Sequence, residues 1–256
     1  MVGFAPAQPF ISLPMTPEHS PHWGLAIDTE RCIGCHACSV ACKVENAVYL
    51  GMFRTKVYYH DFHGKNAAGK TAPKRAFLPA LCMQCEDAPC LKACPTESIS
   101  RGPDGVVRID VDSCDRSRDC IAACPYGAIH IDPVAQVADK CDFCSHRLDA
   151  GLQPACVEAC PADVFAFGDV NDPGSSISRF RAKHGKELAV LKPQERTRPA
   201  VHYRGIGTVV PRAVENKLPK GRNHDPFTYE VDTWAELRAD YGTVVGNATA
   251  KPKGGK

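Results

Sequence analysis

The chain has 256 residues with a formal net charge of +2, and it contains 15 cysteines, 20 glycines and 21 prolines. Aromatic residues make up only 7% of it, so apolar burial is not the main source of its stability. An odd number of cysteines at Cys-x-x-Cys spacing fits a disulfide framework poorly, because cysteines this close seldom pair and one would be left over. We expect bound metal instead, no nucleic acid partner, and no direct membrane span, since no apolar run approaches the required length.

The N-terminal part leads into the first cysteine run. Residues 1–24 are rich in proline, which disfavours helix and central strand, and we expect an extended arm without an export signal. Residues 25–28 predict a short strand, and the first run follows with Cys32, Cys35, Cys38 and Cys42. From Cys38 to Asn46 the sequence favours a helix, which would place Cys38 and Cys42 on one face. Residues 60–76 are polar and basic and predict a surface loop.

The second and third runs share one pattern. The second run has Cys82, Cys85, Cys90 and Cys94, the third has Cys114, Cys120 and Cys124, and a proline follows each, Pro95 or Pro125. Residues 102–105 predict a turn between the runs, and residues 106–111 predict a strand whose expected partner is 128–132. Two runs ending in Cys-Pro on either side of a short hairpin are typical of a two-cluster bacterial ferredoxin. Ser117 stands where a fourth thiol of the third run is expected.

The fourth run has Cys141, Cys144, Cys156 and Cys160, with Pro161 after it. Residues 164–169 predict a closing strand. Residues 171–256 carry no cysteine and several prolines, and we expect an extension that lies on a partner and contains one short helix over 232–241. All 15 cysteines therefore fall into four runs of four, four, three and four.

Two kinds of metal site suit such runs. Zinc is held by paired Cys-x-x-Cys units, but zinc fingers do not call for a third cysteine four residues before a Cys-Pro. A cubic iron–sulfur cluster uses three closely spaced cysteines and one remote cysteine, which is the pattern here. We therefore favour iron–sulfur clusters over zinc.

The arrangement resembles the four-cluster iron–sulfur subunits of the molybdopterin oxidoreductase (dimethyl sulfoxide reductase) family, over residues 25–170. The resemblance implies an α+β fold of two nested bacterial-ferredoxin-like units, made of short hairpins and short helices around clusters, with long irregular N- and C-terminal extensions. The expected divisions are an extended arm over 1–24, the first half of the outer unit with a basic loop over 25–76, the inner unit over 77–135, the second half of the outer unit over 136–170, and a partner-wrapping extension over 171–256.

The resemblance also implies which cysteines share a cluster. We name the sets by their first members: the Cys32 set is Cys32, Cys35, Cys38 and Cys160; the Cys141 set is Cys141, Cys144, Cys156 and Cys42; the Cys82 set is Cys82, Cys85, Cys90 and Cys124; and the Cys114 set is Cys114, Cys120 and Cys94. Each of the first three would hold a 4Fe-4S cluster. The Cys114 set has three thiols and would hold a 3Fe-4S cluster.

Two side chains inside the runs have open roles. Ser117 would lie at the open corner of the three-iron cluster, because a hydroxyl is a much poorer ligand than a thiol. The alternative is that its alkoxide ligates a fourth iron. For His36, we expect a loop position facing solvent, with a hydrogen bond that tunes a cluster as the alternative.

The resemblance implies an electron-transfer subunit without a catalytic site of its own. It would relay single electrons between a molybdopterin-containing catalytic subunit and an integral membrane, quinone-reactive anchor subunit. The expected location is the cytoplasmic face of the membrane, with export as a passenger of the catalytic subunit as the alternative. A free-standing polyferredoxin and a zinc-binding interaction scaffold are the competing functions, and metal analysis separates the second from iron–sulfur chemistry.

Overall fold

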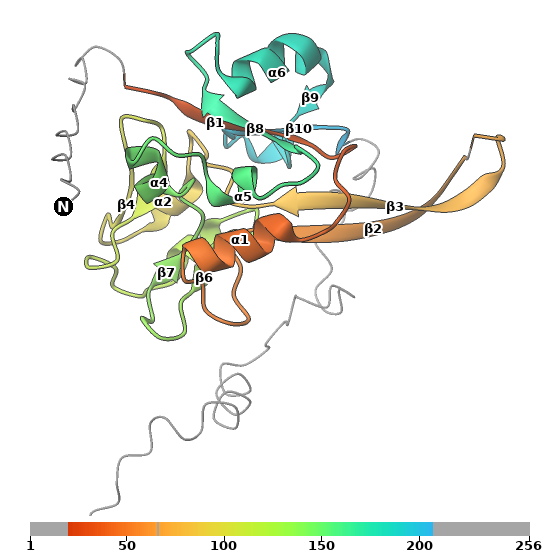
Figure 1. Ribbon diagram of the computed structural model, residues 1–256. Coiled ribbons are helices and arrows are strands. Elements are labelled where there is room, and N and C mark those ends of the chain that lie inside the picture. Colours follow the sequence, from red (N-terminus) through yellow and green to blue (C-terminus); the bar gives the residue numbers. More distant parts are fainter. Residues whose placement is uncertain (1–19, 66, 207–256) are drawn as a thin grey trace, which may run out of the picture.

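A four-stranded sheet forms the centre of the molecule in the computed structural model, which describes residues 20–65 and 67–206 (Figure 1). Its strands lie in the order β8 (Phe165–Asp169), β1 (Trp23–Asp28), β10 (Val201–Arg204) and β9 (Leu188–Ala189). Strand β1 runs antiparallel to β8 and parallel to β10. The structure therefore confirms the strands predicted over 25–28 and 164–169.

The C-terminal side of the described chain folds back on this sheet. Helix α6 (Ser176–His184) begins after Ser175, whose hydroxyl accepts a hydrogen bond from the Ser178 N–H, and its buried Ile177 packs on Ala26 and Ala166 of the sheet. Two short 3-10 helices, η1 (Gly185–Glu187) and η2 (Pro193–Glu195), lead to β10. The expected irregular extension is thus wrong for residues 171–206, because alternating Val201 and Tyr203 are fully buried in the sheet. The helix predicted over 232–241 lies outside the described residues, as do residues 1–19 of the arm predicted over 1–24. The last two residues of that arm, Trp23 and Gly24, belong to strand β1.

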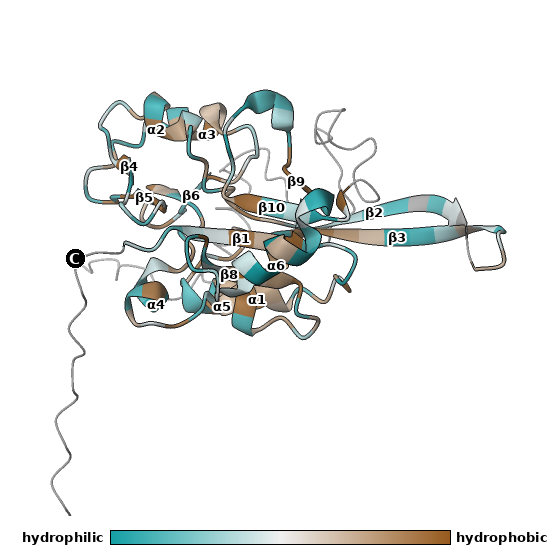
Figure 2. Ribbon diagram, turned by 90° about the horizontal axis from the view of Figure 1, so that it is seen from above, coloured by the Kyte–Doolittle hydropathy of each residue, from teal (hydrophilic) through white to brown (hydrophobic). Residues whose placement is uncertain are grey.

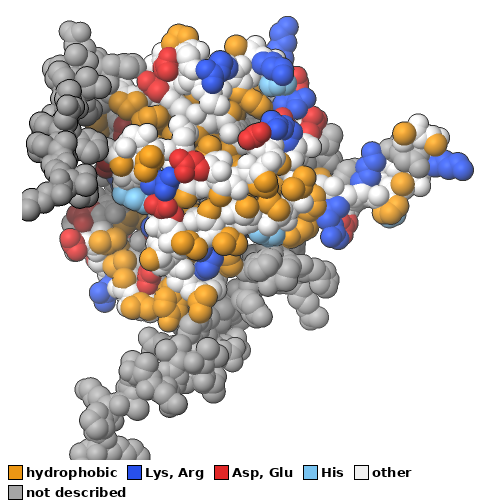
Figure 3. Space-filling model, viewed as in Figure 1, with side chains coloured by type: hydrophobic (Ala, Val, Ile, Leu, Met, Phe, Trp, Pro, Cys, Tyr) orange, Lys and Arg blue, Asp and Glu red, His pale blue; other side chains and the backbone are white. Residues whose placement is uncertain are grey.

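A long hairpin projects from the body where a basic loop was expected (Figures 1 and 2). Strands β2 (Lys56–Lys65) and β3 (Thr71–Ala80) pair antiparallel along their full length. Its outer part carries basic side chains, among them Lys74 and Arg75 (Figure 3). The loop prediction for 60–76 is wrong because the paired backbones satisfy each other's hydrogen bonds, so the polar side chains of these strands stay exposed at little cost.

Short helices and two small hairpins surround the cysteines. The helices are α1 (Ala37–Glu45), α2 (Pro89–Ala93), α3 (Asp119–Ala123), α4 (Ser145–Asp149) and α5 (Ala155–Glu158). Helix α1 confirms the helix expected after Cys38. The small hairpins pair β4 (Ile99–Arg101) with β5 (Val107–Ile109), and β6 (His130–Ile131) with β7 (Ala138–Asp139).

The predicted pairing of 106–111 with 128–132 is wrong. Strand β5 pairs with β4 across the turn that contains Gly105, and β6 pairs with β7 across another short turn. Closing a short loop costs less chain entropy than joining segments further apart, which favours these local hairpins.

The helices bring distant cysteine runs together. Helix α1 of the first run packs on α5 of the fourth, and α2 of the second run packs on α3 of the third. The first and fourth runs are also held together by the sheet, because β1, which precedes the first run, pairs with β8, which follows the fourth. Within the part of the chain that the structure describes, no helix has the length and hydropathy to cross a membrane.

Candidate iron–sulfur sites

Each cysteine run begins with a loop that has a left-handed residue at the same position. The residue two positions after the first cysteine adopts a left-handed conformation in all four runs, with φ of 69° at Gly34, 48° at Gln84, 69° at Arg116 and 58° at Phe143. Three of these residues are not glycine, so the loops carry backbone strain that the surroundings must hold. The residue that follows is Cys35, Cys85, Ser117 or Cys144. Ser117 therefore occupies the backbone position that a cysteine holds in the other three runs.

In the Cys32 set, thiols from the first and fourth cysteine runs come together. Burial, the largest cause, raises the pKa of the Cys38 thiol to about 12, and charges on Cys32 and Cys160 raise it further. The backbone N–H of Val164 donates to the Cys160 sulfur at 3.4 Å. Cys35 is the one exposed cysteine of the chain, so this set reaches the surface.

The Cys141 set is the most deeply buried. Burial raises the pKa values of Cys141 and Cys156 well above the ordinary range, and charge on Cys42 adds to both. Together with Cys144, these thiols line a small cavity. Such thiols become thiolates only if a positive charge enters among them, which bound iron would supply.

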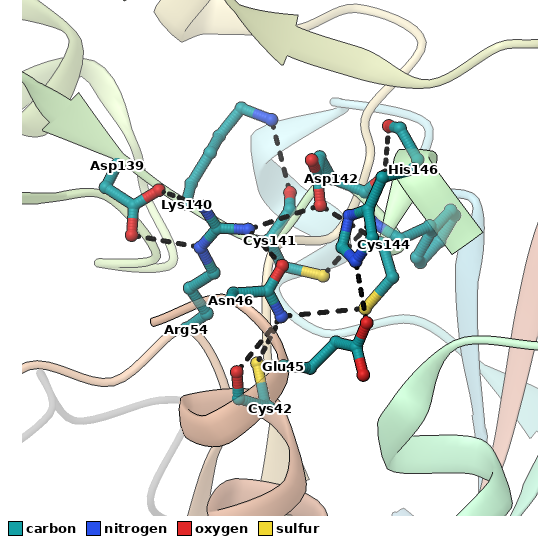
Figure 4. A network of polar contacts seen from close by, with 12 residues as sticks. Cys42, Glu45, Asn46, Arg54, Asp139, Lys140, Cys141, Asp142, Cys144 and His146 are labelled. Carbon is teal, nitrogen blue, oxygen red and sulfur yellow. Dashed lines mark hydrogen bonds and ion pairs between the residues drawn. The ribbon is translucent and has the colours of Figure 1, made fainter. Parts of the chain in front are cut away.

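A network of polar side chains holds two thiols of the Cys141 set (Figure 4). The Asn46 amide donates to the Cys42 sulfur at 3.7 Å, to the Cys144 sulfur at 3.6 Å and to the Cys42 carbonyl at 3.0 Å. The Arg54 guanidinium donates to the Asn46 side-chain oxygen at 2.8 Å. Arg54 also forms ion pairs with Asp139 at 2.6 Å and Asp142 at 3.3 Å. The amide is thereby fixed with its N–H groups toward the sulfurs.

The Cys82 set lies under the segment that precedes β10. Burial raises the pKa of Cys90 to about 12 and of Cys85 to about 11, and charges on Cys82 and Cys124 add to both. The buried hydroxyl of Thr197 acts in the opposite sense on Cys85, because it donates toward that thiol. Thr197 also bonds to the Tyr126 hydroxyl at 2.6 Å. The backbone N–H groups of 86 and 87 bond to the carbonyls of 198 and 197, which fixes this segment on the loop.

The Cys114 set differs from the others in the pKa of one thiol as well as in the number of its thiols. Charges on Cys114 and Cys94 raise the pKa of the Cys120 thiol, after burial as the largest cause. For Cys94, burial raises the pKa, but hydrogen bonds from Ser98 and Thr96 outweigh it and lower the pKa to about 7. The side chain of Ser117 is exposed, and its backbone N–H bonds to Asp115 at 3.1 Å.

Two buried hydroxyls test whether these residues suit iron–sulfur clusters. Ser39 Oγ and Thr55 Oγ1 are buried and make no well-formed hydrogen bond among the described residues; each lies toward a thiol, Cys38 or Cys42, whose pKa it lowers against the larger effect of burial. Ser39 directly follows Cys38, and Thr55 lines the cavity of the Cys141 set. A buried donor left without an acceptor costs about 1–3 kcal/mol. The sulfurs of bound clusters would be acceptors for both, so the residues fit the group.

No three His, Cys, Asp or Glu side chains in residues 20–65 and 67–206 are grouped tightly enough to hold a single metal ion. A cluster holds its thiolates at separate corners, further apart than the ligands of one ion.

His36 does not face solvent as expected. It is half-buried, its ring stands against the Tyr59 ring with centroids 5.4 Å apart, and its Nε2 bonds to the Tyr59 hydroxyl. The first cysteine loop is thereby joined to the base of the β2–β3 hairpin. Phe77 of β3 reinforces this contact, because its ring packs so closely on Gly34 that a Cβ atom there would overlap it.

Several residues around the thiols carry no signal in the sequence. Asn46 and Cys144 are 98 positions apart and Arg54 and Asp139 are 85 apart, so these contacts have no local pattern. Ser98, four residues after Cys94, is the exception, since a hydroxyl this close in sequence to a ligand could have been singled out.

Comparison with known proteins agrees with this chemistry. A model described as a 4Fe-4S dicluster domain matches residues 73–170, and a 4Fe-4S binding domain matches residues 23–44. The chain is 40% identical to a subunit of tetrathionate reductase from Salmonella typhimurium, over 75% of this chain and 74% of that protein. It is 38% identical to a chain of polysulfide reductase from Wolinella succinogenes, over 68% and 87%. It is 41% identical to the electron transfer subunit of thiosulfate reductase from Salmonella typhi, over 60% and 78%.

The spacing of the cysteines, the loops that carry them and the matched proteins all indicate iron–sulfur clusters. The chain therefore belongs to the iron–sulfur electron-transfer subunits of the molybdopterin oxidoreductase family.

Proposed function

We propose that the chain relays single electrons between a molybdopterin-containing catalytic subunit and a quinone-reactive membrane anchor subunit, with the four cysteine sets as ligands of three 4Fe-4S clusters and one 3Fe-4S cluster. Bound iron–sulfur clusters would supply one-electron redox chemistry over a wide range of potentials. The observation that carries the proposal is that all 15 cysteines fall into four runs, and that helix α1 of the first run packs on α5 of the fourth while α2 of the second packs on α3 of the third.

The burial of the sets supports a relay with two exposed ends. The Cys141 set lies inside, with Cys141 and Cys156 at 6% exposure, so water is kept from the middle of the path. Exposed Cys35 marks one end, and exposed Ser117 marks the other. A partner that exchanges electrons must approach a cluster closely, and these two sets are the ones that the surface exposes.

The backbone at Ser117 supports the three-iron assignment of the Cys114 set. The loop has a left-handed residue at Arg116, the position that is left-handed in the other three runs, and a serine follows it where they have a cysteine. A hydroxyl in place of the thiol leaves one corner without a good ligand.

The proposed location is the cytoplasmic face of the membrane, held there by the anchor subunit. Export as a folded passenger of the catalytic subunit would place it on the periplasmic face instead. Protease protection of the complex in sealed vesicles of known orientation separates the two.

The relay is tested on the complex purified with its partner subunits. Metal analysis should give at least one iron atom for each cysteine of this chain and no stoichiometric zinc. Replacing Cys141→Ser should abolish passage of electrons from a quinol to the catalytic subunit, while the electron paramagnetic resonance signals of the Cys32 and Cys114 sets persist. Stoichiometric zinc, or an unchanged electron-transfer rate in a variant that has lost the buried cluster, would contradict the proposal.

A further inference from the structure

A basic cavity lies beside the Cys82 set and is lined in part by Glu86 of the second cysteine run. It has a volume of about 670 Å³ and is formed by the start of β1, helix α6 and the segment from η2 to β10. Four cationic side chains line it, Arg181, Lys192, Arg196 and Arg198, against the single carboxylate of Glu86. The electron relay described above uses none of these side chains.

Two of the cations have local partners. Arg198 forms ion pairs with Glu86 at 2.7 Å and with Asp87 at 2.6 Å, so its charge is compensated. Lys192 donates to the carbonyl of Pro125, which is a neutral acceptor.

The other two cations have no carboxylate partner among the described residues. Arg181 is half-buried and its one side-chain hydrogen bond goes to Nδ1 of His202 at 3.2 Å, which leaves most of its N–H donors unused. Burial, followed by the charge of Arg181, lowers the pKa of His202, so this ring is neutral and does not offset the charge. The guanidinium of Arg196 has no hydrogen bond or ion pair in the described part of the chain, and the backbone of this residue is left-handed with φ of 51°.

Both apolar and polar side chains line the cavity. The apolar ones include Trp23, whose ring stacks on Phe167 at 5.3 Å, and Val190. The polar ones include Thr197, whose buried hydroxyl acts on the Cys85 thiol of the Cys82 set. A ligand here would combine an anionic group with some apolar surface, and it would sit one side chain away from a cluster ligand.

We propose that this cavity is a binding site for a carboxylate or similar oxyanion, held by Arg181 and Arg196. Guanidinium groups bind carboxylates and other oxyanions through paired N–H donors, and here they supply a positive charge that no residue described in the structure neutralises. The anion can come from a free small molecule or from an acidic side chain of the adjoining subunit, since both present the same chemistry.

The first test measures anion binding to the full-length protein with its clusters intact. Succinate and inorganic phosphate are titrated calorimetrically at constant ionic strength, with chloride as the reference. We expect saturable binding that weakens about tenfold or more in Arg181→Gln and in Arg196→Gln, because each loses a charge-assisted hydrogen bond. Arg179→Gln is the matched control, since Arg179 lies on the same helix, is exposed and bonds to the Gly174 carbonyl outside the cavity.

The second test measures retention of the catalytic subunit when the complex is purified through this chain. If free anions do not bind but Arg181→Gln and Arg196→Gln lose the partner while Arg179→Gln keeps it, the anion is a carboxylate of that subunit. Cluster absorbance checks that each variant is folded, and exposed Arg196 carries little risk of misfolding. If neither anion binding nor partner retention distinguishes the two variants from the control, the cations serve only to offset the cluster charge and the proposal is overturned. Neither readout depends on electron transfer, so the relay can fail its own test independently.

Discussion

Removing the Asn46 amide should lower the reduction potential of the cluster proposed for the Cys141 set. The Asn46 amide donates to the sulfurs of Cys42 and Cys144 at 3.7 and 3.6 Å, and reduction makes those sulfurs more negative. Each N–H group therefore favours the reduced form, and Asn46→Ala removes both contacts.

The size of the shift follows from the strength of the two contacts. Hydrogen bonds contribute about 0.5–1.5 kcal/mol net, and both distances are long, so we take about 0.5 kcal/mol of difference between redox states for each contact. For one electron, 1.4 kcal/mol corresponds to about 59 mV, which gives a lowering of about 40 mV. Asn46→Asp should lower the potential further, because it adds a negative charge beside the same sulfurs.

The assay is a redox titration of the purified complex, followed by electron paramagnetic resonance. Asn171→Ala is the control, since Asn171 is exposed and lines the basic cavity rather than the Cys141 set. The potentials of the other clusters should stay unchanged in all variants. An unchanged potential of this cluster in Asn46→Ala, with all clusters present, would show that the amide is only structural.

Two further predictions concern the supports of the sets. Gly34→Ala should destabilise the protein by about 2–4 kcal/mol and weaken the hold on the cluster proposed for the Cys32 set. The reason is that Gly34 has φ of 69° and a Cβ atom there would overlap the Phe77 ring. The control, Gly151→Ala, has φ of 73° but no atom within 4 Å of the new Cβ, so it should cost only about 1–2 kcal/mol. The readout is the urea concentration at which cluster absorbance is lost, and equal effects of the two changes would refute the packing argument. Arg54→Met should cost about 3 kcal/mol, because it leaves half-buried Asp142 without a cation and Asp139 with only the ring of His130 at 3.2 Å. Arg75→Met, which breaks an exposed pair with Asp61, should change the urea midpoint little, and equal lowering of the midpoint by both variants would contradict this.

The cysteine positions were the part of the site that sequence could supply. Tight local spacing brings ligands such as Cys141 and Cys144 into one loop, so their grouping needs no tertiary information. The strand at 25–28 and the helix after Cys38 were also local, and both are present as β1 and α1.

The parts of the fold and of the site that sequence did not predict depend on contacts between residues far apart in the chain. The β2–β3 hairpin was missed because its polar composition resembles a loop, although Val57, Tyr58 and Tyr59 favour a strand. The alternation at 201–204 was a usable signal for β10, but its parallel pairing with β1 joins segments 176 residues apart. Asn46 and Arg54 reach the Cys141 set only after the first and fourth runs meet.

Ser117→Cys tests the central claim most directly. The oxidised wild-type protein should give the electron paramagnetic resonance signal of a 3Fe-4S cluster, because the Cys114 set offers three thiols and an exposed hydroxyl. The variant places a thiol directly after Arg116, at the loop position that holds a cysteine in the other three runs, so it should bind one more iron and lose that signal on conversion to a 4Fe-4S cluster. A wild-type protein without the signal, or a variant that keeps it unchanged, would contradict the account.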